Sequence, residues 1–257
     1  MFKFEAPVFV HKNILKKDML EELRDYPLMI NRMMFADCGS GVLKGTDITW
    51  EDSILKVHPG LILHGGNIYR MEEACSLRCP PASQLTYVKV RFVTMDYEKD
   101  RMGGFGDVYL DDRLPEQGEI ELGRFRLQEG ARLRCEYENF EDYQTEFDTV
   151  NRIHMPYVCP GGVSLWPELF MEFALELLNT GSEDSYDISF AMQILGNKGQ
   201  ISQELVTFYV EKRMGKKVMD WSNQVIFEKL LNILKEQKAG NGGLKRQQSN
   251  TRQMLLL

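Results

Sequence analysis

The sequence lacks the long hydrophobic runs and leader patterns that would tie it to a membrane or a secretory route. Its 257 residues contain no run of about 18 apolar residues, so we expect no transmembrane helix. Glu5 and Pro7 interrupt the apolar opening, and no small-residue cleavage pattern follows, which argues against a signal peptide. We therefore expect the chain to be made and folded in the cytoplasm.

The cysteine count and the net charge argue against two further classes of protein. The five cysteines are an odd number in a chain long enough to form a core, so we expect reduced thiols rather than a disulfide framework. A net charge of −7 argues against a general nucleic-acid binder, which usually carries a basic face. A hydrophobic fraction of 43% and a charged fraction of 27% are close to ordinary globular usage, which argues against disorder of the whole chain.

Motifs for metal and phosphate chemistry are missing as well. Cys75 and Cys79 form one close pair, whereas a structural zinc site commonly draws on two. His58 and His64 flank a Pro-Gly turn without an acid in ligand register. The glycine-rich stretch 102–112 lacks the Gly-Lys-Ser/Thr ending of a phosphate loop and the acid spacing of a calcium loop. We expect no metal and no cofactor.

The sequence also lacks a nucleophile motif, because Gly-x-Ser-x-Gly does not occur. Residues 136–148 carry six acids and no Lys or Arg, and paired carboxylates can hydrolyse glycosides when they share a cleft. Phe140, Tyr143 and Phe147 follow helix spacing, however, so the simpler interpretation is an amphipathic helix with a solvated acidic face. We expect no enzyme, and a cell-wall glycoside hydrolase is the less favoured alternative.

Strand patterns are abundant in the first half of the chain. Alternating apolar residues between turn signals predict antiparallel strands. These strands are Ile54 to Val57, Leu61 to Leu63, Asn67 to Met71, Leu85 to Met95 and Glu119 to Gln128. Residues 96–118 are rich in Gly and Asp and are predicted as a long exposed loop or a hairpin tip.

Helical spacing marks both ends of the chain. Apolar residues from Ile14 to Tyr26 recur at three- and four-residue steps, and Pro27 predicts the end of that helix. Cap residues and glycine stops predict further helices over 164–178, 184–195, 202–214 and 220–239. We predict an α+β fold: an N-terminal helix plus a small antiparallel β-sandwich or barrel-like module, followed by an α-helical C-terminal region.

Shifts in composition divide the chain into five parts, with the main boundary at the prolines and glycines of residues 155–162. The parts are an N-terminal arm and helix at 1–35, an antiparallel β domain at 36–135, an acidic amphipathic helix or linker at 136–155, a helical domain at 156–239, and a flexible tail with an apolar end at 240–257.

Several segments resemble proteins of bacteriophage baseplates and tail fibres. GSGVLKG at Gly39–Gly45, LKVHPG at Leu55–Gly60 and GGN at Gly65–Asn67 resemble a compact β element near the N-termini of such proteins. Residues 85–95 and 119–134 are similar to the second half of that element. ELGRFRLQEGA at Glu121–Ala131 resembles uncharacterised prophage tail proteins of Gram-positive bacteria. The resemblance implies a non-enzymatic structural subunit of a phage tail or tail-like contractile particle, at the baseplate or fibre attachment. Such a subunit would be made in the bacterial cytoplasm and assembled into the particle.

The resemblance also implies partners, which are other tail, baseplate or fibre subunits in a homo-oligomer or symmetric assembly, without nucleic acid. Such contacts would use edge strands, the N-terminal arm and the C-terminal tail. The candidate interaction residues are Phe2, Phe4, Phe105, Asp107, Tyr109, Met254, Leu255, Leu256 and Leu257. The main alternative is a carbohydrate-binding module of a receptor-binding protein, which would use Tyr97, Phe105 and Tyr109 beside Asp107 and Asp111.

Overall fold

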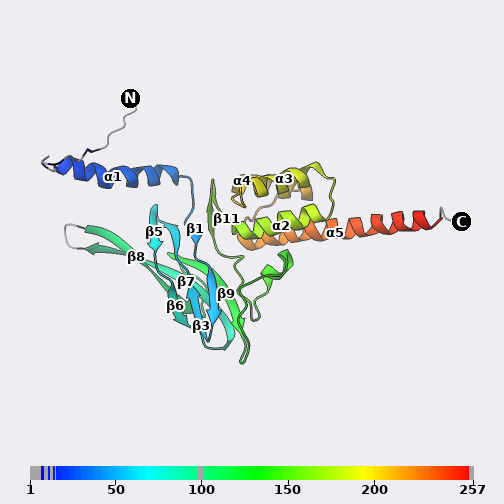
Figure 1. Ribbon diagram of the computed structural model, residues 1–257, viewed down its shortest axis with the longest axis horizontal. Coiled ribbons are helices and arrows are strands. Elements are labelled where there is room, and N and C mark those ends of the chain that lie inside the picture. Colours follow the sequence, from blue (N-terminus) through cyan, green and yellow to red (C-terminus); the bar gives the residue numbers. More distant parts are fainter. Residues whose placement is uncertain (1–6, 9–10, 12–13, 15, 98–100, 255–257) are drawn as a thin grey trace.

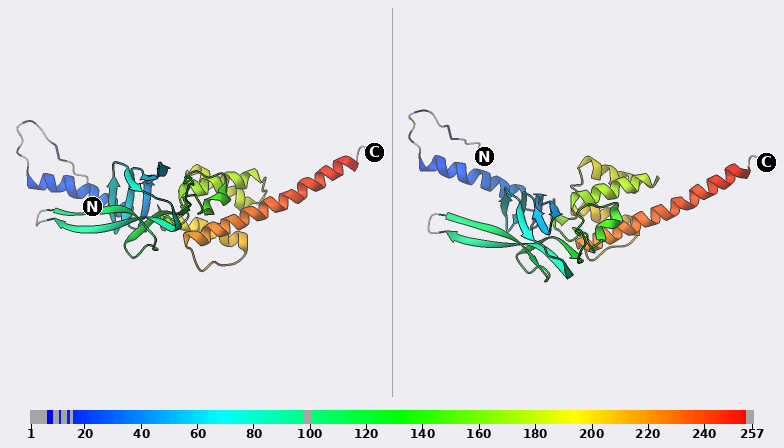
Figure 2. Two further views of the ribbon diagram at one scale, coloured as in Figure 1. Left: turned by 90° about the horizontal axis from the view of Figure 1, so that it is seen from below. Right: turned by 60° about the horizontal axis from the view of Figure 1, so that its bottom comes forward.

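The computed structural model describes residues 7–8, 11, 14, 16–97 and 101–254, and their arrangement is elongated (Figure 1). Phe2, Phe4 and Leu255 to Leu257, predicted as interaction residues, lie outside this range, as does the side chain of Met254. Helix α1 (Lys17–Met34) and the β7–β8 hairpin extend from one end of the molecule, and helix α5 extends from the other (Figures 1 and 2).

The first sheet is mixed and has five strands in the order β11-β10-β1-β4-β5. Its strands are β1 (Gly41–Gly45), β4 (Gly60–His64), β5 (Asn67–Met71), β10 (Tyr157–Cys159) and β11 (Gly162–Ser164). Gly65 and Gly66 close the β4–β5 hairpin with φ of 55° and 75°, the left-handed pair that a tight two-residue turn requires. β1 and β10 run parallel, so residues from the predicted boundary at 155–162 join the sheet of the N-terminal half.

Two further sheets are antiparallel and have three strands each. One has the order β2-β3-β6, built from β2 (Ile48–Glu51), β3 (Ile54–Val57) and β6 (Cys75–Arg78). The other has the order β8-β7-β9, built from β7 (Ala82–Tyr97), β8 (Arg101–Asp111) and β9 (Glu119–Leu127).

The C-terminal region is helical, with α2 (Pro167–Asn179), α3 (Ser185–Gly196), α4 (Gln203–Met214) and α5 (Asn223–Met254). Three of the predicted helix ends are observed. Asp184 and Ser202 accept backbone hydrogen bonds at the starts of α3 and α4, and Gly215 ends α4 in the left-handed conformation. The α+β fold with a helical C-terminal region is confirmed.

One continuous apolar core joins the strands to the helices. Phe140, on the short 3-10 helix η1 (Phe140–Gln144), packs edge-on against Phe173 of α2, with ring centroids 5.3 Å apart. The same ring stacks on Phe227 of α5 at 4.7 Å. Because these aromatic contacts connect the two halves, their burial stabilises the halves together.

The predicted helix over Phe140–Val150 is wrong. Only Phe140–Gln144 is helical, as a single 3-10 turn, and the chain then runs extended beside β9. Backbone hydrogen bonds from Arg126 to Glu146 and from Arg124 to Asn151 hold this extended segment. Pairing with β9 therefore outweighs the helical spacing of four apolar residues, Phe140, Tyr143, Phe147 and Val150.

Residues 101–111, predicted within a long loop, form strand β8, which pairs along its whole length with β7. Pro27, predicted to end the first helix, lies inside α1, because a proline removes one hydrogen bond without forbidding the helix between good helix formers. Ser164, predicted as a helix cap, is the last residue of β11.

The segment from Gly240 onward, predicted as a flexible tail, is helical as far as Met254. A glycine in a helix costs only about 1 kcal/mol relative to alanine, and extending a nucleated helix is easier than starting one.

Candidate functional site

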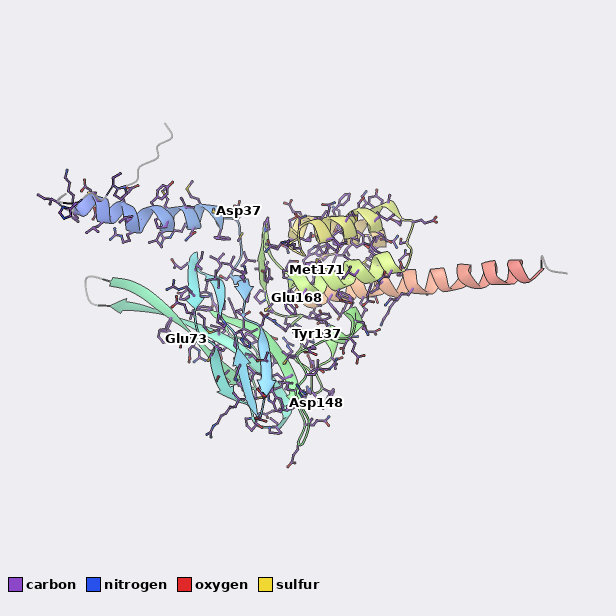
Figure 3. All side chains as sticks on the ribbon, in the orientation of Figure 1. Asp37, Glu73, Tyr137, Asp148, Glu168 and Met171 are labelled. Carbon is purple, nitrogen blue, oxygen red and sulfur yellow. The ribbon has the colours of Figure 1, made fainter. Side chains whose placement is uncertain are left out.

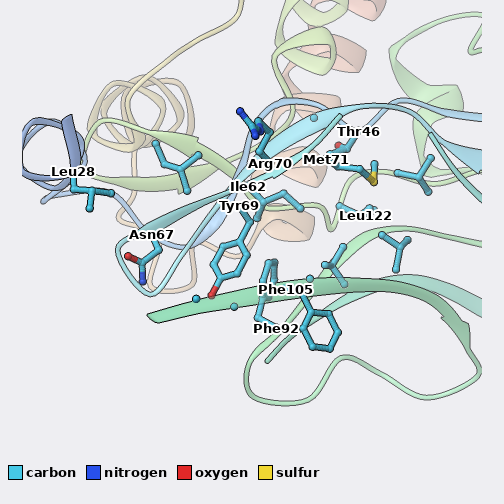
Figure 4. Close-up of a pocket in the computed structure, with 18 of the residues that line it drawn as sticks. Leu28, Thr46, Ile62, Asn67, Tyr69, Arg70, Met71, Phe92, Phe105 and Leu122 are labelled. Atoms are coloured by element: carbon cyan, nitrogen blue, oxygen red, sulfur yellow. The ribbon is translucent and has the colours of Figure 1, made fainter. Parts of the chain in front are cut away.

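A groove of about 580 Å³ lies between the β4–β5 hairpin and the β7–β8 hairpin, with α1 at its rim (Figure 4). Its lining is mostly apolar. The labelled apolar and aromatic side chains are Leu28, Ile62, Tyr69, Met71, Phe92, Phe105 and Leu122. Grooves of this size and composition are typical binding sites for apolar groups.

Aromatic rings form one wall of the groove. Tyr69 on β5 meets Phe92 on β7 edge-to-face, with centroids 4.7 Å apart. His64 stacks on the same Phe92 ring at 4.2 Å, and burial lowers the pKa of this histidine. The imidazole therefore supports the Phe92 ring from outside the set of residues that line the groove.

A glycine of β8 makes this wall fit. A Cβ at Gly104 would lie 2.8 Å from Tyr69 Oη and 2.9 Å from the Val93 carbonyl oxygen, both shorter than real Cβ contacts. Only glycine therefore allows Tyr69 to approach the strand. Glycine inside a strand pattern is the sequence signal that could have revealed this contact, because it marks a close approach.

The two strands that flank the groove, β5 and β8, are edge strands of their sheets. An edge strand presents backbone N–H and C=O groups along one side, and an extended peptide can pair with them. The groove thus combines an apolar floor with two strand edges, which suits an extended apolar segment of another protein.

The groove has no chemistry for bond cleavage among the residues that the structure describes in its lining. These include no Ser, Cys, His, Asp or Glu. Its polar side chains are cationic or neutral: Arg32 on α1, Asn67, Tyr69 and Arg70 on β5, and Thr46 directly after β1. They can pair with carboxylates or backbone carbonyls at the rim, but they do not form a catalytic set.

A second candidate site is the charged cluster around Lys89 on β7. The Lys89 ammonium is 1% exposed and lies 2.8 Å from an Asp111 carboxylate oxygen and 2.9 Å from one of Glu119. The Tyr109 hydroxyl donates to Glu119, and Arg91 pairs with the same carboxylate at 2.9 Å. Four charged groups and one phenol therefore satisfy one another.

The pKa shifts in this cluster show that its charged groups stabilise one another in their ionised forms. Burial alone would raise the pKa of Glu119, but hydrogen bonds from the Glu116 N–H, Tyr109, Lys89 and Arg91 outweigh it and lower the pKa to about 2. Burial would lower the pKa of Lys89, and its hydrogen bonds with the two carboxylates raise it instead. Every charge is fixed near neutral pH, so we assign this cluster to structure rather than to proton transfer.

The three predicted loop residues lie on one face of β8, because side chains alternate along a strand. Phe105 is exposed and reaches the groove, and Asp107 is exposed beside it. Tyr109 belongs to the Lys89 cluster, where the Arg91 guanidinium lies 4.8 Å from its ring centroid. The carbohydrate-binding alternative therefore has one of its three candidate rings, Tyr109, engaged with Arg91, while the side chain of Tyr97 lies outside the described residues.

Two of the acids at 136–148, candidates for glycoside hydrolysis, are engaged in ion pairs. Arg134 donates to Asp142 at 2.7 Å and lowers the pKa of this carboxyl to about 2. Glu141 pairs with Lys235 of α5 at 2.6 Å. A general acid for this reaction needs a raised pKa, so these two carboxylates serve as ion-pair partners.

A third cluster lies where the strands meet the helices, near Tyr137 and Glu168 (Figure 3). The buried Arg152 guanidinium lies 4.1 Å from the Trp166 ring centroid and donates to the Thr46 carbonyl oxygen at 3.1 Å. Tyr137 stacks on Tyr143 at 3.9 Å. Arg152 thereby connects the first sheet to the start of α2, and we assign this cluster to the connection between the two halves.

Over the part of the chain that the structure describes, no group of three or more His, Cys, Asp or Glu could hold a metal ion. Within the same part, no helix combines the length and apolarity needed to cross a membrane.

Comparisons with known proteins return few matches. No family model and no curated protein matches the chain. A crystal structure of TssK is similar at 11% identity and a TM-score of 0.45, covering 92% of this chain and 72% of that chain. A cryo-electron-microscopy structure of the type VI secretion system TssK-TssF-TssG baseplate subcomplex is similar at 11% identity and a TM-score of 0.38, covering 92% of this chain and 100% of that chain.

Proposed function

We propose that this chain is a non-enzymatic structural subunit of a phage tail or tail-like contractile particle, at the baseplate or fibre attachment. The observation that carries the proposal is the apolar groove between two edge strands, with no reactive side chain among its described lining residues. The sequence resemblance at Gly39–Gly45, Leu55–Gly60 and Gly65–Asn67 supports the choice of particle.

The shape of the molecule supports the same function. α1 and the β7–β8 hairpin extend from one end and α5 from the other (Figure 2). Such extensions expose side chains and strand edges that a compact enzyme would bury, and they are suited to contacts with neighbouring subunits. We propose partners among other tail or baseplate subunits and copies of the chain itself, in a symmetric assembly.

Two further parts of this proposal concern the organisation of the chain. We retain the division into an arm and helix, a β domain and a helical domain, with the main boundary placed at residues 155–162. We propose that Phe105 contacts a partner at the groove and that Asp107 contacts it beside the groove, whereas Tyr109 acts through the Lys89 cluster. Phe2, Phe4 and Met254 to Leu257 are kept as contact residues of the two ends of the chain.

The experiment that tests this function compares incorporation into particles. Tagged chain is produced in cells that make the particle, and purified particles are probed for it. Phe105→Ala removes an exposed aromatic at the groove, and Phe208→Ala removes an exposed aromatic on α4. We expect the first variant to lose incorporation several-fold and the second to incorporate normally. Purified particles that lack the unmodified chain would contradict the proposal.

A further inference from the structure

The groove is bordered by the backbone edges of two strands. All five residues of β5, Asn67–Met71, line it. On β8, residues 103–106 line it in succession. Because successive side chains of a strand point to opposite faces, a groove that meets every residue in turn runs along the edge of the strand. The unpaired edges of β5 and β8 therefore face this groove.

These edges define the kind of partner that fits. An extended segment can add to an edge strand through backbone hydrogen bonds, and every second side chain then enters the pocket beside it. Gly103, Gly104 and Gly106 of β8 line the groove. A large aromatic side chain on a paired strand can cover such edge glycines. The partner should therefore be extended, apolar at alternate positions and aromatic at some of them.

The chain contains a segment of this description before helix α1, at residues 2–10, which we call the arm segment. Its alternate positions are all apolar: Phe2, Phe4, Ala6, Val8 and Val10. In an extended conformation these side chains would share one face. The arm segment would then span about 30 Å and the edge of β8 about 36 Å, so the segment fits on this edge. Pro7 is compatible with an added edge strand, because its missing N–H can be on the solvent side.

Charge favours the arm segment in one register. No residue of the groove lining that the structure describes is acidic, and Arg32 and Arg70 are exposed at the rim. Arg70 already pairs with Glu72 at 3.2 Å, so Arg32 is the cation that a bound segment would use. Glu5, on the outward face of the arm segment, can pair with Arg32. Lys3 on the same face would be repelled there, which selects the register with Glu5 at the rim.

The described residues before α1 do not fill the groove of their own chain. Val8 is 69% exposed. None of the described residues at positions 7, 8, 11, 14 and 16 lines the groove. These observations favour a groove on another molecule as the binding site of the arm segment.

We infer that the arm segment of one copy of this chain occupies the groove of a second copy, as an added strand along β8. The inference deepens the proposed function by naming the partner of the groove, and it rests on that function in treating the chain as an assembly subunit. The contact joins two different surfaces of the same chain. Its repetition therefore builds a ring where the rotation closes and a filament where it does not.

The first test measures the mass of the purified full-length chain by sedimentation equilibrium across a range of concentrations. Phe4→Glu places a charge on the apolar face of the arm segment. Phe9→Glu is the matched control, because it changes the same residue type on the opposite face of the same segment. We expect wild type and Phe9→Glu to self-associate with rising concentration, and Phe4→Glu to weaken self-association by about tenfold or more. Thermal melting confirms that each variant folds.

A charge exchange tests where the segment binds. Arg32→Glu and Glu5→Arg each bring like charges together at the rim, and we expect each to weaken self-association by about threefold. The double variant restores an opposite pair and should associate like wild type. A double variant weaker than both single variants would overturn the placement of the arm segment in the groove.

A synthetic peptide of residues 1–12 is the direct probe. Added to the Phe4→Glu chain, it should slow hydrogen exchange of the β8 amides at residues 103–108, and unchanged exchange would overturn the inference. A monomeric wild type at all concentrations would overturn it too, as would equal weakening by Phe4→Glu and Phe9→Glu. A monomer whose β8 amides lose protection in Phe4→Glu would place the arm segment in the groove of its own chain.

The inference and the proposed function fail in different experiments. A chain that is monomeric yet present in purified particles rejects the exchanged arm segment and retains the structural subunit. A chain that self-associates through the arm segment but is absent from purified particles does the reverse.

Discussion

Helices α1 and α2 carry comparable apolar stripes and bury them differently. α2 buries five side chains completely against the rest of the core: Leu169, Phe170, Phe173, Ala174 and Leu177. α1 buries none. The comparison teaches that the spacing of apolar residues specifies a face that must be covered, while the tertiary fold decides whether the same chain covers it.

The largest expected difference between the two helices is in stability. Phe173→Ala in α2 removes a fully buried ring, and we expect it to lower the free energy of unfolding by about 3–5 kcal/mol. Leu23→Ala in α1 removes an exposed side chain, and we expect a change within about 0.5 kcal/mol. Urea denaturation at low protein concentration measures both, because dilution removes any contribution from self-association. Equal losses would mean that α1 is part of the folded core.

The Lys89 cluster extends the comparison to buried charge. Lys89→Met leaves the carboxylates of Asp111 and Glu119 without their buried cation, and we expect a loss of about 3 kcal/mol. Lys217→Met, at an exposed position between α4 and α5, is the control and should be nearly neutral. Thermal melting compares the stability of the two variants. If Lys89→Met loses no stability, the cluster does not stabilise the sheet formed by β8, β7 and β9.

The groove wall should respond to a single methyl group. Gly104→Ala forces Tyr69 or the Val93 carbonyl to move, and we expect it to cost about 1–3 kcal/mol. Gly196→Ala, where an added Cβ meets no atom within 4 Å, should be neutral or slightly stabilising. Chemical denaturation distinguishes them, and a tolerated Gly104→Ala would indicate that the wall is not closely packed.

The last expected effect concerns pH and is confined to acid conditions. The pKa of Glu119 is about 2 in the folded chain and about 4.3 when unfolded, so the unfolded state binds more protons in this interval. The stability that Glu119 contributes is therefore complete above about pH 5 and is lost as the pH falls toward 2. Glu119→Gln should show a shallower loss than wild type over this window in urea titrations at several pH values. Parallel curves would contradict the assignment.

Much of the fold could be predicted from local signals. Strands β3 and β5 have the predicted ends, because their turns are fixed by glycine and by neighbouring polar residues. Ser202 and Gly215 bound α4 as predicted, because capping depends on a few adjacent residues. Such local chemistry is visible in a single sequence.

The errors at β8 and at residues 140–150 share a different cause, which is strand pairing that local spacing does not show. β8 is a strand because β7 pairs with it, although its glycines are poor strand formers. The groove depends on Tyr69, Phe92 and Gly104, three positions from three strands that no sequence spacing connects. Phe105 was predicted as a contact residue, but the site around it follows only from the fold.

The measurement that tests the central claim most directly is hydrogen exchange of the α1 and α2 amides in dilute protein. A short helix with few tertiary contacts is only marginally stable, so we expect α1, which buries no side chain, to exchange much faster than α2, which buries five. An α1 that is as protected as α2 would contradict the account.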